Sequence, residues 1–574
     1  MPDIDNKISF NDFMLNSNIR ENLLNWYDFR PNSKILFVGS DIYKSLLENG
    51  NEVIMLTLDE NYKKIDRVRV YNETLLQFQN RQEKVDYIVV VNEMKRISKY
   101  VEKKEETLSK LINISSKILT ERGVLLVTLD NKFSIKNFSG ATYDNKEAYD
   151  VVLGREKNGA IYSKNELENI VNNSVFKFHK IYYPFPDYHL PSIVYSNEYL
   201  VNGNSSKLNY LIYYNPEDKI LFNEIEAMHE IAKDGMLNYF SNSFFVEFSN
   251  LKESLSKVKF ASYNNFRKDE NKLITKMYDG FVQKIPLQNA SSNHHIENIK
   301  YNIEILKKCN LDTCDRVEDN KVISEYQSLP TFNEYIGKMV SEGKIDIIKE
   351  LIKKWYEIIY NSLMCMFCEK MPQKNDIFAK YGIIVKDKTK QKMHFLKDCL
   401  FDLVFENVFV DIDDNYEFKK FIVYDQEWNE KNAPSEFILY RAIKNMMQNN
   451  SKISKYLSKE KLYSELNIQE FVEYFEKIDT KIQEELLDKD VANMYSSTYN
   501  ALTTIEGLIE IINEEKGKFD RLLKDVERTN ATWQETLDKT NENWENRVKK
   551  LEEELIVYKS RNPKYILKKL LKKK

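Results

Sequence analysis

The stretch from Phe401 to Trp428, FDLVFENVFVDIDDNYEFKKFIVYDQEW, carries acidic and amide side chains in a regular order. Asp402 is followed five residues later by Asn407, and Asp425 follows two apolar runs that a polar turn separates. Two such runs predict a β-hairpin, which would bring these three side chains together. Phosphoryl transfer uses one carboxylate as a proton acceptor, and an amide and a second carboxylate as Mg²⁺ ligands. The pattern therefore predicts Asp402 as a catalytic residue and Asn407 and Asp425 as metal ligands, with an ordinary hairpin with acidic ends as the alternative.

The spacing D-x-x-x-x-N, followed by a hairpin and an Asp, resembles the catalytic and metal-binding segments of protein-kinase-like and aminoglycoside-phosphotransferase-like enzymes. The tetrapeptide DQEW at 425–428 is similar to the small-molecule kinase form, Asp, any residue, Glu. The sequence departs from the pattern before Asp402, where Leu400 and Phe401 replace the usual His plus Arg or Gly. The resemblance implies an α+β kinase-like domain over residues 251–490, with ATP and Mg²⁺ as cofactors.

Residues that would bind the nucleotide are expected upstream, in the order that the same fold requires. Lys276 lies in a predicted strand, Lys272–Tyr278, where the fold keeps the lysine that contacts the phosphates; one more surface lysine is the alternative. Glu297, in the next predicted helix, is the expected ion-pair partner of that lysine. Glu325 and Tyr326 end a segment that resembles the adenine-binding strand and hinge. We expect all four to be cofactor-binding residues.

Residues 34–200 alternate short apolar runs with helical patterns, which predicts a parallel sheet covered on both faces. The predicted strands are Ile35–Gly39, Val53–Leu58, Arg67–Tyr71, Tyr87–Val91, Val124–Leu129 and an antiparallel end-pair, Lys177–Tyr183 and Ser192–Ser196. This order resembles class I S-adenosylmethionine (SAM)-dependent methyltransferases. The phrases DNKFSIKNFSGA at 130–141 and YYPFPDYHLPSIVYSNEYL at 182–200 resemble a branch of such domains linked to bacterial surface-polysaccharide loci. The resemblance implies an α/β Rossmann-like domain over residues 1–250.

The SAM site of that family requires a glycine-rich turn after the first strand and a carboxylate at the end of the second. The first turn here, VGSDIY, contains one glycine, Gly39. Thr57 stands where the family places its acid, and Asp59 follows two residues later. Gly39 and Asp59 are the predicted cofactor-binding residues of a degenerate site, so SAM is doubtful as a cofactor on this interpretation.

The C-terminal part has a heptad pattern. Apolar residues recur at seven-residue steps in two series, shifted by four: Ile505, Ile512, Phe519, Val526 and Trp533, then Leu537, Trp544, Leu551 and Tyr558. Such a shift is a stutter, so a coiled coil over residues 500–562 is predicted, and with it a homo-oligomer. A single helix folding back on the globular part is the alternative. Residues 563–574, PKYILKKLLKKK, predict a basic amphipathic tail for an anionic membrane surface, with a solvated lysine tail as the alternative.

Composition limits the partners and the compartment. The chain has 574 residues and a net charge of only −4, so no overall field indicates nucleic acid as a partner. Neither a signal segment nor a membrane-spanning apolar run is evident, and five cysteines fit a reducing compartment. The predicted location is cytoplasmic, peripheral to the inner face of the cell membrane.

The order of these parts resembles the chain-terminating methyltransferase–kinase proteins of polymannose O-antigen synthesis. That resemblance implies phosphoryl transfer from ATP to a glycan hydroxyl in surface-polysaccharide biosynthesis, beside a methyltransferase-like domain of doubtful activity. The expected partners are a glycan or lipid-linked polysaccharide and glycosyltransferases. The alternative is a non-catalytic coiled-coil scaffold that organises glycosyltransferases at the membrane.

Overall fold

The protein forms two compact units, Met1–Leu502 and Thr503–Lys574. The computed structural model describes residues 17–39, 43–57, 65–101, 103, 106–140, 148–155, 160–201, 219–287, 293–372, 375–449, 453–489 and 503–572. All statements below concern these residues.

The first unit begins with a parallel sheet. Strand β1 (Lys34–Val38) pairs in parallel with β2 (Glu52–Leu56) and with β4 (Val85–Val90). Strand β3 (Val68–Tyr71) extends the sheet beyond β2, and β5 (Leu119–Asn131) extends it beyond β4. The short apolar runs of the sequence become these strands because a parallel sheet is buried on both faces. The predicted Rossmann-like α/β fold is confirmed in this region.

Strand β10 (Ser243–Ser249) lies between β5 and β7 (Phe178–Phe185) and is antiparallel to both. The sequence analysis predicted no strand here and made Lys177–Tyr183 and Ser192–Ser196 the end of the sheet. That prediction is corrected. Strands β7 and β8 (Ile193–Ser196) do pair antiparallel, but β10 occupies the other edge of β7 and the sheet continues beyond β8.

Helices cover both faces of this sheet. Alternate strand residues belong to different cores: Leu36 packs with one group of helices, whereas Ile35 and Phe37 pack with the N-terminal segment. The helices of the first face are α3 (Leu75–Gln79), α5 (Thr107–Ile118), α8 (Lys164–Asn172) and α9 (Glu224–Lys233). The second face is covered by α2 (Asn22–Asn25) and η2 (Lys44–Leu47). The strand period of two thus produces a three-layer arrangement.

The sheet continues into the second predicted domain. Strand β8 pairs with β11 (Phe260–Tyr263), through Phe260 opposite Tyr195 and Ser262 opposite Ile193. Beyond β11 the strands follow in the order β12 (Leu273–Met277), β13 (Phe281–Pro286), β15 (Lys321–Glu325) and β14 (Asp315–Glu318). With β6 (Ile161–Tyr162) beside β5, this sheet contains 14 strands among the described residues. Residues on both sides of position 250 therefore share one sheet.

A mostly helical part follows and has its own core. The predicted hairpin is present as β17 (Val408–Ile412) and β18 (Phe418–Val423). The elements around it include α11 (Asn293–Lys308), α12 (Phe332–Ser341), α13 (Ile345–Ser362), β16 (Phe395–Cys399), η10 (Phe405–Asn407), β19 (Glu430–Pro434), α16 (Glu436–Asn449), α17 (Lys459–Glu465) and α18 (Val472–Leu486). Trp355 and Phe405 are buried at its centre, with ring centroids 4.8 Å apart.

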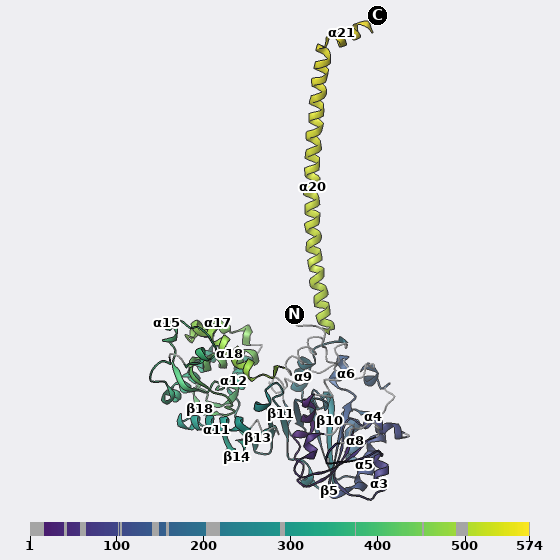
Figure 1. Ribbon diagram of the computed structural model, residues 1–574, viewed down its shortest axis with the longest axis vertical. Helices are drawn as coiled ribbons and strands as arrows, with labels where there is room; N and C mark the ends of the chain where they lie inside the picture. The colour runs from purple at the N-terminus through teal and green to yellow at the C-terminus, as the bar shows by residue number, and fades with distance from the viewer. Residues whose placement is uncertain are drawn as a thin grey trace. The chain divides into compact units, whose positions relative to one another are not determined.

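The second unit contains the long helix α20 (Ile505–Arg561), which Figure 1 shows unbroken, and α21 (Pro563–Leu571). The Asn562 side chain accepts from the Lys564 N–H and so caps α21, whose first residue is proline. The large apolar side chains of the heptad series from Ile512 to Tyr558 are exposed, among them Trp533 and Trp544. None of the helices in the described ranges combines the length and apolar character needed to cross a membrane.

Replacing Phe245 by alanine tests the central position of β10. Phe245 is 1% exposed, and its ring lies 5.6 Å from that of Trp26, so Phe245→Ala should lower the free energy of unfolding by about 3–5 kcal/mol. The matched control is Phe178→Ala, because Phe178 lies in β7 but is 36% exposed, and should cost about 1 kcal/mol or less. Denaturant unfolding measures both changes. Equal losses would contradict the buried position of β10.

Candidate functional site

The carboxyl ends of β1, β2, β4, β5 and β7 meet at one edge of the sheet, because β10 is antiparallel to both β5 and β7. Ligands of open α/β sheets bind outside these ends. Gly39 follows β1, Thr57 follows β2 and Asn92 follows β4. This edge is the first candidate site.

Gly39 is required here by close packing. A Cβ atom at this position would lie 2.6 Å from Cζ of Phe37. Its N–H donates to the Leu56 carbonyl at 3.3 Å, so the ends of β1 and β2 are held together. Thr57 is buried beside it, and Asp59 lies outside the described residues. A glycine, a hydroxyl and the Asn92 amide form a small, neutral set of groups, which fits the adenosine part of SAM.

The loop after β7 completes this edge, and the sequence analysis did not single it out as a site. The Asn242 side chain donates to the Pro186 carbonyl at 2.9 Å, and the Tyr188 N–H donates to Oγ of Ser243 at 3.0 Å. The Tyr188 hydroxyl donates to Oδ1 of Asn92 at 3.0 Å, so the loop reaches the end of β4. In the sequence, this loop is marked only by the polar residues Asp187, Tyr188 and His189 inside the stretch YYPFPDYHLPS.

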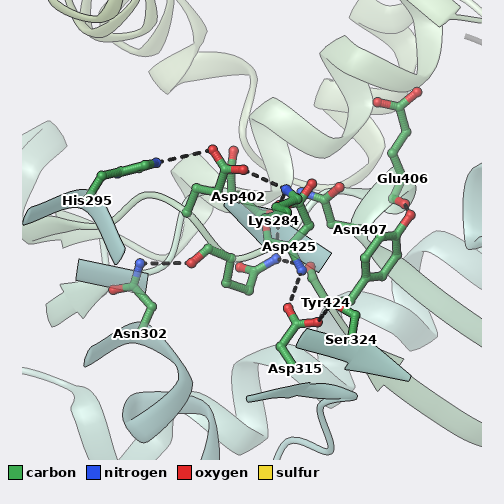
Figure 2. A network of polar contacts seen from close by, with 12 residues as sticks. Lys284, His295, Asn302, Asp315, Ser324, Asp402, Glu406, Asn407, Tyr424 and Asp425 are labelled. Atoms are coloured by element: carbon green, nitrogen blue, oxygen red, sulfur yellow. Dashed lines mark hydrogen bonds and ion pairs between the residues drawn. The ribbon is translucent and has the colours of Figure 1, made fainter. Parts of the chain in front are cut away.

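A second candidate site is a buried cluster of charges around Glu427, which is 3% exposed (Figure 2). Lys284, on β13, donates to Oε1 of Glu427 at 2.6 Å and also to the Asp425 carboxylate. Arg267 pairs with the same glutamate, and Nε2 of His295 lies 3.4 Å from Oε2. Two carboxylates are thus compensated by three basic groups, as burial of charge requires.

The structure brings together Asp402, Asn407 and Asp425, the residues predicted for phosphoryl transfer, and each of them bonds to other residues of the chain. The Asn407 amide donates to the carbonyls of Asp402, at 3.0 Å, and Asp425, at 3.3 Å. The Asp402 carboxylate lies 3.5 Å from Nη2 of Arg441. Asp425 has a φ of 57°, and its N–H donates to Oδ2 of Asp315 at 2.7 Å. Figure 2 shows Asp402, Asn407 and Asp425 around Lys284, which contacts the carboxylate of Asp425.

Burial and neighbouring charges act differently on the two carboxyls of this cluster. For Glu427, burial alone would raise the pKa, but Arg267, Lys284 and His295 hold it well below its usual range. For Asp425, burial raises the pKa to about 7, against the lowering effect of Lys284 and together with repulsion from Glu427. Asp402 also has a raised pKa, because burial outweighs the effect of Arg441.

Lys276 and Glu297 do not join this cluster. Lys276 donates from β12 to Oδ1 of Asp28 at 2.7 Å, in the N-terminal segment. The lysine beside Asp425 is Lys284, on the next strand. Glu297 is exposed on α11 and lies 4.0 Å from Lys300, so it makes no pair with Lys276.

The predicted hinge residues, Glu325 and Tyr326, also make backbone contacts with the neighbouring strand and turn of the sheet. Glu325 is the last residue of β15 and is paired with Phe281 of β13. The Tyr326 N–H donates to the Gly280 carbonyl at 3.0 Å, and its ring is 53% exposed. The Tyr326 N–H is thus already bonded within the chain, whereas the prediction has backbone groups of this segment bind adenine.

A cavity of about 340 Å³ lies beside Asp402. Its lining includes Arg267 and Arg441, the Trp428 indole and, from the loop after β11, Asn265. Arg441 stacks on the Phe401 ring at 4.7 Å. In the described part of the chain, no three or more His, Cys, Asp or Glu side chains are grouped so as to hold a metal ion.

No protein-family model matches the chain, and no curated protein does. The solved structures that match include SAM-dependent methyltransferases. Those from Thermotoga maritima and Archaeoglobus fulgidus are each 12% identical, with a TM-score of 0.24, and cover 42% of this chain and 94% of their own. The phosphoethanolamine N-methyltransferase 2 of Haemonchus contortus, in complex with phosphomonomethylethanolamine and S-adenosylhomocysteine (SAH), is 13% identical, with a TM-score of 0.24, and covers 41% of this chain and 53% of its own.

The expected cofactors are therefore corrected. ATP and Mg²⁺ were expected and SAM was held doubtful, whereas the matching structures include SAM-dependent methyltransferases and methyltransferases with SAH bound.

The charged cluster yields a prediction about stability. Glu427→Gln removes the charge that compensates Arg267 and Lys284, so it should lower the free energy of unfolding by about 3–5 kcal/mol at pH 7. Because the folded pKa of Glu427 is lowered, its contribution exists above the unfolded pKa and is lost as the pH falls below about 4. Urea unfolding of both proteins at several pH values measures this difference.

The matched control is Glu297→Gln, which changes an exposed glutamate on α11 and should cost about 0.5 kcal/mol or less. A Glu427→Gln protein as stable as this control would show that the cluster is not held by its charges.

Proposed function

We propose that the chain is a SAM-dependent methyltransferase that acts in bacterial surface-polysaccharide biosynthesis on a glycan acceptor. The observation that carries the proposal is β10 between β5 and β7, which brings Gly39, Thr57 and Asn92 to the same edge as the loop after β7. These three residues would hold SAM, and the bound group would supply the methyl. The glycan acceptor rests on the resemblance of residues 130–141 and 182–200 to polysaccharide-locus domains.

Binding of SAM to the full chain tests the proposal by calorimetry. Asn92→Gly removes the side chain without backbone strain, since Asn92 has a φ of 56°. It removes the amide that would bond SAM and also the acceptor of the Tyr188 hydroxyl, so it should weaken SAM binding about tenfold or more. The control Asn172→Gly changes an exposed residue at the end of α8 and should leave the dissociation constant unchanged. Absence of heat from the unmodified chain would overturn the proposed function.

A non-catalytic scaffold is the second candidate, for residues 251–490. The observation in its favour is the compensated cluster, in which Lys284 bonds both Asp425 and Glu427. In this role the segment would keep the kinase-like arrangement predicted from the sequence and would bind glycosyltransferases. A chain that binds no SAM but co-purifies with such enzymes would favour this candidate over the first.

We also propose that α20 self-associates as a parallel coiled coil that presents α21 to the inner face of an anionic membrane. The support is the exposure of its heptad residues: Ile512 63%, Phe519 63%, Trp533 65%, Trp544 62% and Leu551 56%. Side chains of this size are rarely left along one helix without a partner. Parallel packing would place the lysines of α21 at one end, where several tails bind together.

Two deletions test this arrangement. Removal of residues 503–574 should leave a monomer in sedimentation, because the apolar seam of α20 is lost. Removal of 563–574 alone should keep the oligomer but reduce binding to anionic vesicles, most strongly at low salt. An oligomer that survives the longer deletion would contradict self-association through α20.

A further inference from the structure

Two thiols meet where the end of α11 contacts the segment that follows α13. Cys309 comes directly after α11, and Cys365 lies in η9 (Leu363–Met366). Their sulfur atoms are 3.5 Å apart, although the two residues are 56 positions apart in the chain. Thiols that are already in contact are the ones that a disulfide bond can join.

The contact is specific to these two of the five cysteines. The spacing C-x-x-C at 365–368 is typical of a redox pair within one motif, whereas the structure places Cys365 beside Cys309. Each of the other three thiols donates to an oxygen atom: Cys314 to Oδ1 of Asp315 at 3.8 Å, Cys368 to Oδ1 of Asn432 at 3.6 Å, and Cys399 to the Pro434 carbonyl at 3.7 Å.

The two thiols of the pair differ in their access to solvent. Cys365 is exposed, whereas Cys309 is 2% exposed and belongs to the same core as Trp355 and Leu363. Burial, together with the neighbouring Cys365 sulfur, raises the pKa of Cys309 to about 12. A thiol must lose its proton before it attacks another sulfur, so the buried Cys309 does not react first. Cys365 is therefore the thiol that meets a reagent from solvent, and Cys309 is the one that reacts after it.

We propose that Cys365 and Cys309 form a site of reversible oxidation by a low-molecular-weight disulfide. This goes beyond the proposed function and does not depend on it. In the first step the Cys365 thiolate attacks one sulfur of the reagent, the sulfur–sulfur bond of the reagent breaks, and its other half leaves as a thiolate. In the second step the Cys309 sulfur loses its proton and attacks the Cys365 sulfur, and the remaining half of the reagent leaves as a thiol. Two protein thiols are thus oxidised to one disulfide, and the reagent is reduced to two thiols.

The bond links the oxidation state of the pair to the charged cluster through α11. The Asn302 side chain on this helix donates to the Gln426 carbonyl at 3.0 Å, and Nε2 of His295 lies 3.4 Å from Oε2 of Glu427. A disulfide ties the end of the same helix to η9. Disulfides that form and break in this way serve as redox sensors in reducing compartments.

The experiment treats the folded full chain with glutathione disulfide and then measures the masses of peptides from a digest made without reduction. The unmodified chain should give a cross-linked pair of peptides that contain Cys309 and Cys365, and a reducing thiol should remove the cross-link. Cys365→Ser changes an exposed position and should abolish the cross-link. Cys368→Ser is the matched control, because it removes the other cysteine of the C-x-x-C spacing and should leave the cross-link unchanged.

Cys309→Ala separates the two steps. This variant should accumulate the mixed disulfide of Cys365 with glutathione, because the thiol that displaces the glutathione is absent. In the unmodified chain the same adduct should appear first and decline as the cross-link forms. Cys365→Ser and Cys368→Ser leave the buried position intact, so their comparison decides the proposal even where Cys309→Ala does not fold.

Three outcomes would overturn the pair. The first is a cross-link between Cys365 and Cys368 in place of the expected one. The second is a reaction of the unmodified chain that stops at the mixed disulfide, or that leaves Cys365 unmodified. The third is a cross-link between Cys309 and Cys365 that forms only in urea, since it would then belong to the unfolded chain.

Discussion

The hydrogen bonding of β10 on both of its edges is the constraint on which the first unit depends. Because β10 runs against β5 and β7, those two strands share a direction, and the loop after β7 ends at the edge where β1, β2 and β4 also end. The strand is fixed by Glu247 at its centre, which accepts from the hydroxyls of Tyr27 at 2.9 Å and Tyr182 at 3.1 Å. Burial raises the pKa of Glu247 to about 7, so these bonds hold a carboxyl that is partly neutral at neutral pH.

Strands β1 to β5 could be predicted because each is a continuous apolar run, as burial on both faces of a parallel sheet requires. Strand β10 was missed because its run, SFFVEFS, is interrupted by Glu247 and stands next to the boundary expected at position 250. Its position between two strands that precede it in the chain is a non-local pairing, about which hydrophobic periodicity carries no information.

The prediction of Lys276 in place of Lys284, the lysine that contacts Asp425, also has a specific cause. Strands β12 and β13 each carry one lysine, and both fit the expected place of a phosphate-binding residue. Lys284 lies opposite Thr275, and side chains on one strand alternate between faces, so Lys276 points to the face opposite that of Lys284. Lys276 contacts Asp28 on one face of the sheet, and Lys284 contacts Asp425 on the other. The sequence gives the spacing of the two lysines but not the strand register that decides between them. The cluster around Glu427 was also hidden, because Arg267, Lys284 and His295 are all more than 100 positions from Glu427 in the chain.

The two candidate sites are connected through asparagine side chains rather than through the strands alone. Asn22 donates to the Pro191 carbonyl at 2.9 Å and to Oδ1 of Asn265 at 2.8 Å, and Asn265 donates to Oγ of Ser192 at 2.9 Å. Pro191 and Ser192 follow His189, and Asn265 is two residues before Arg267 in the lining of the cavity beside Asp402. Buried amides that satisfy one another in this way fix a loop more strictly than apolar contacts do. The loop between β7 and β8 and the loop that brings Arg267 to Glu427 are therefore held by one hydrogen-bonded set, so a displacement of either loop must break bonds to the other.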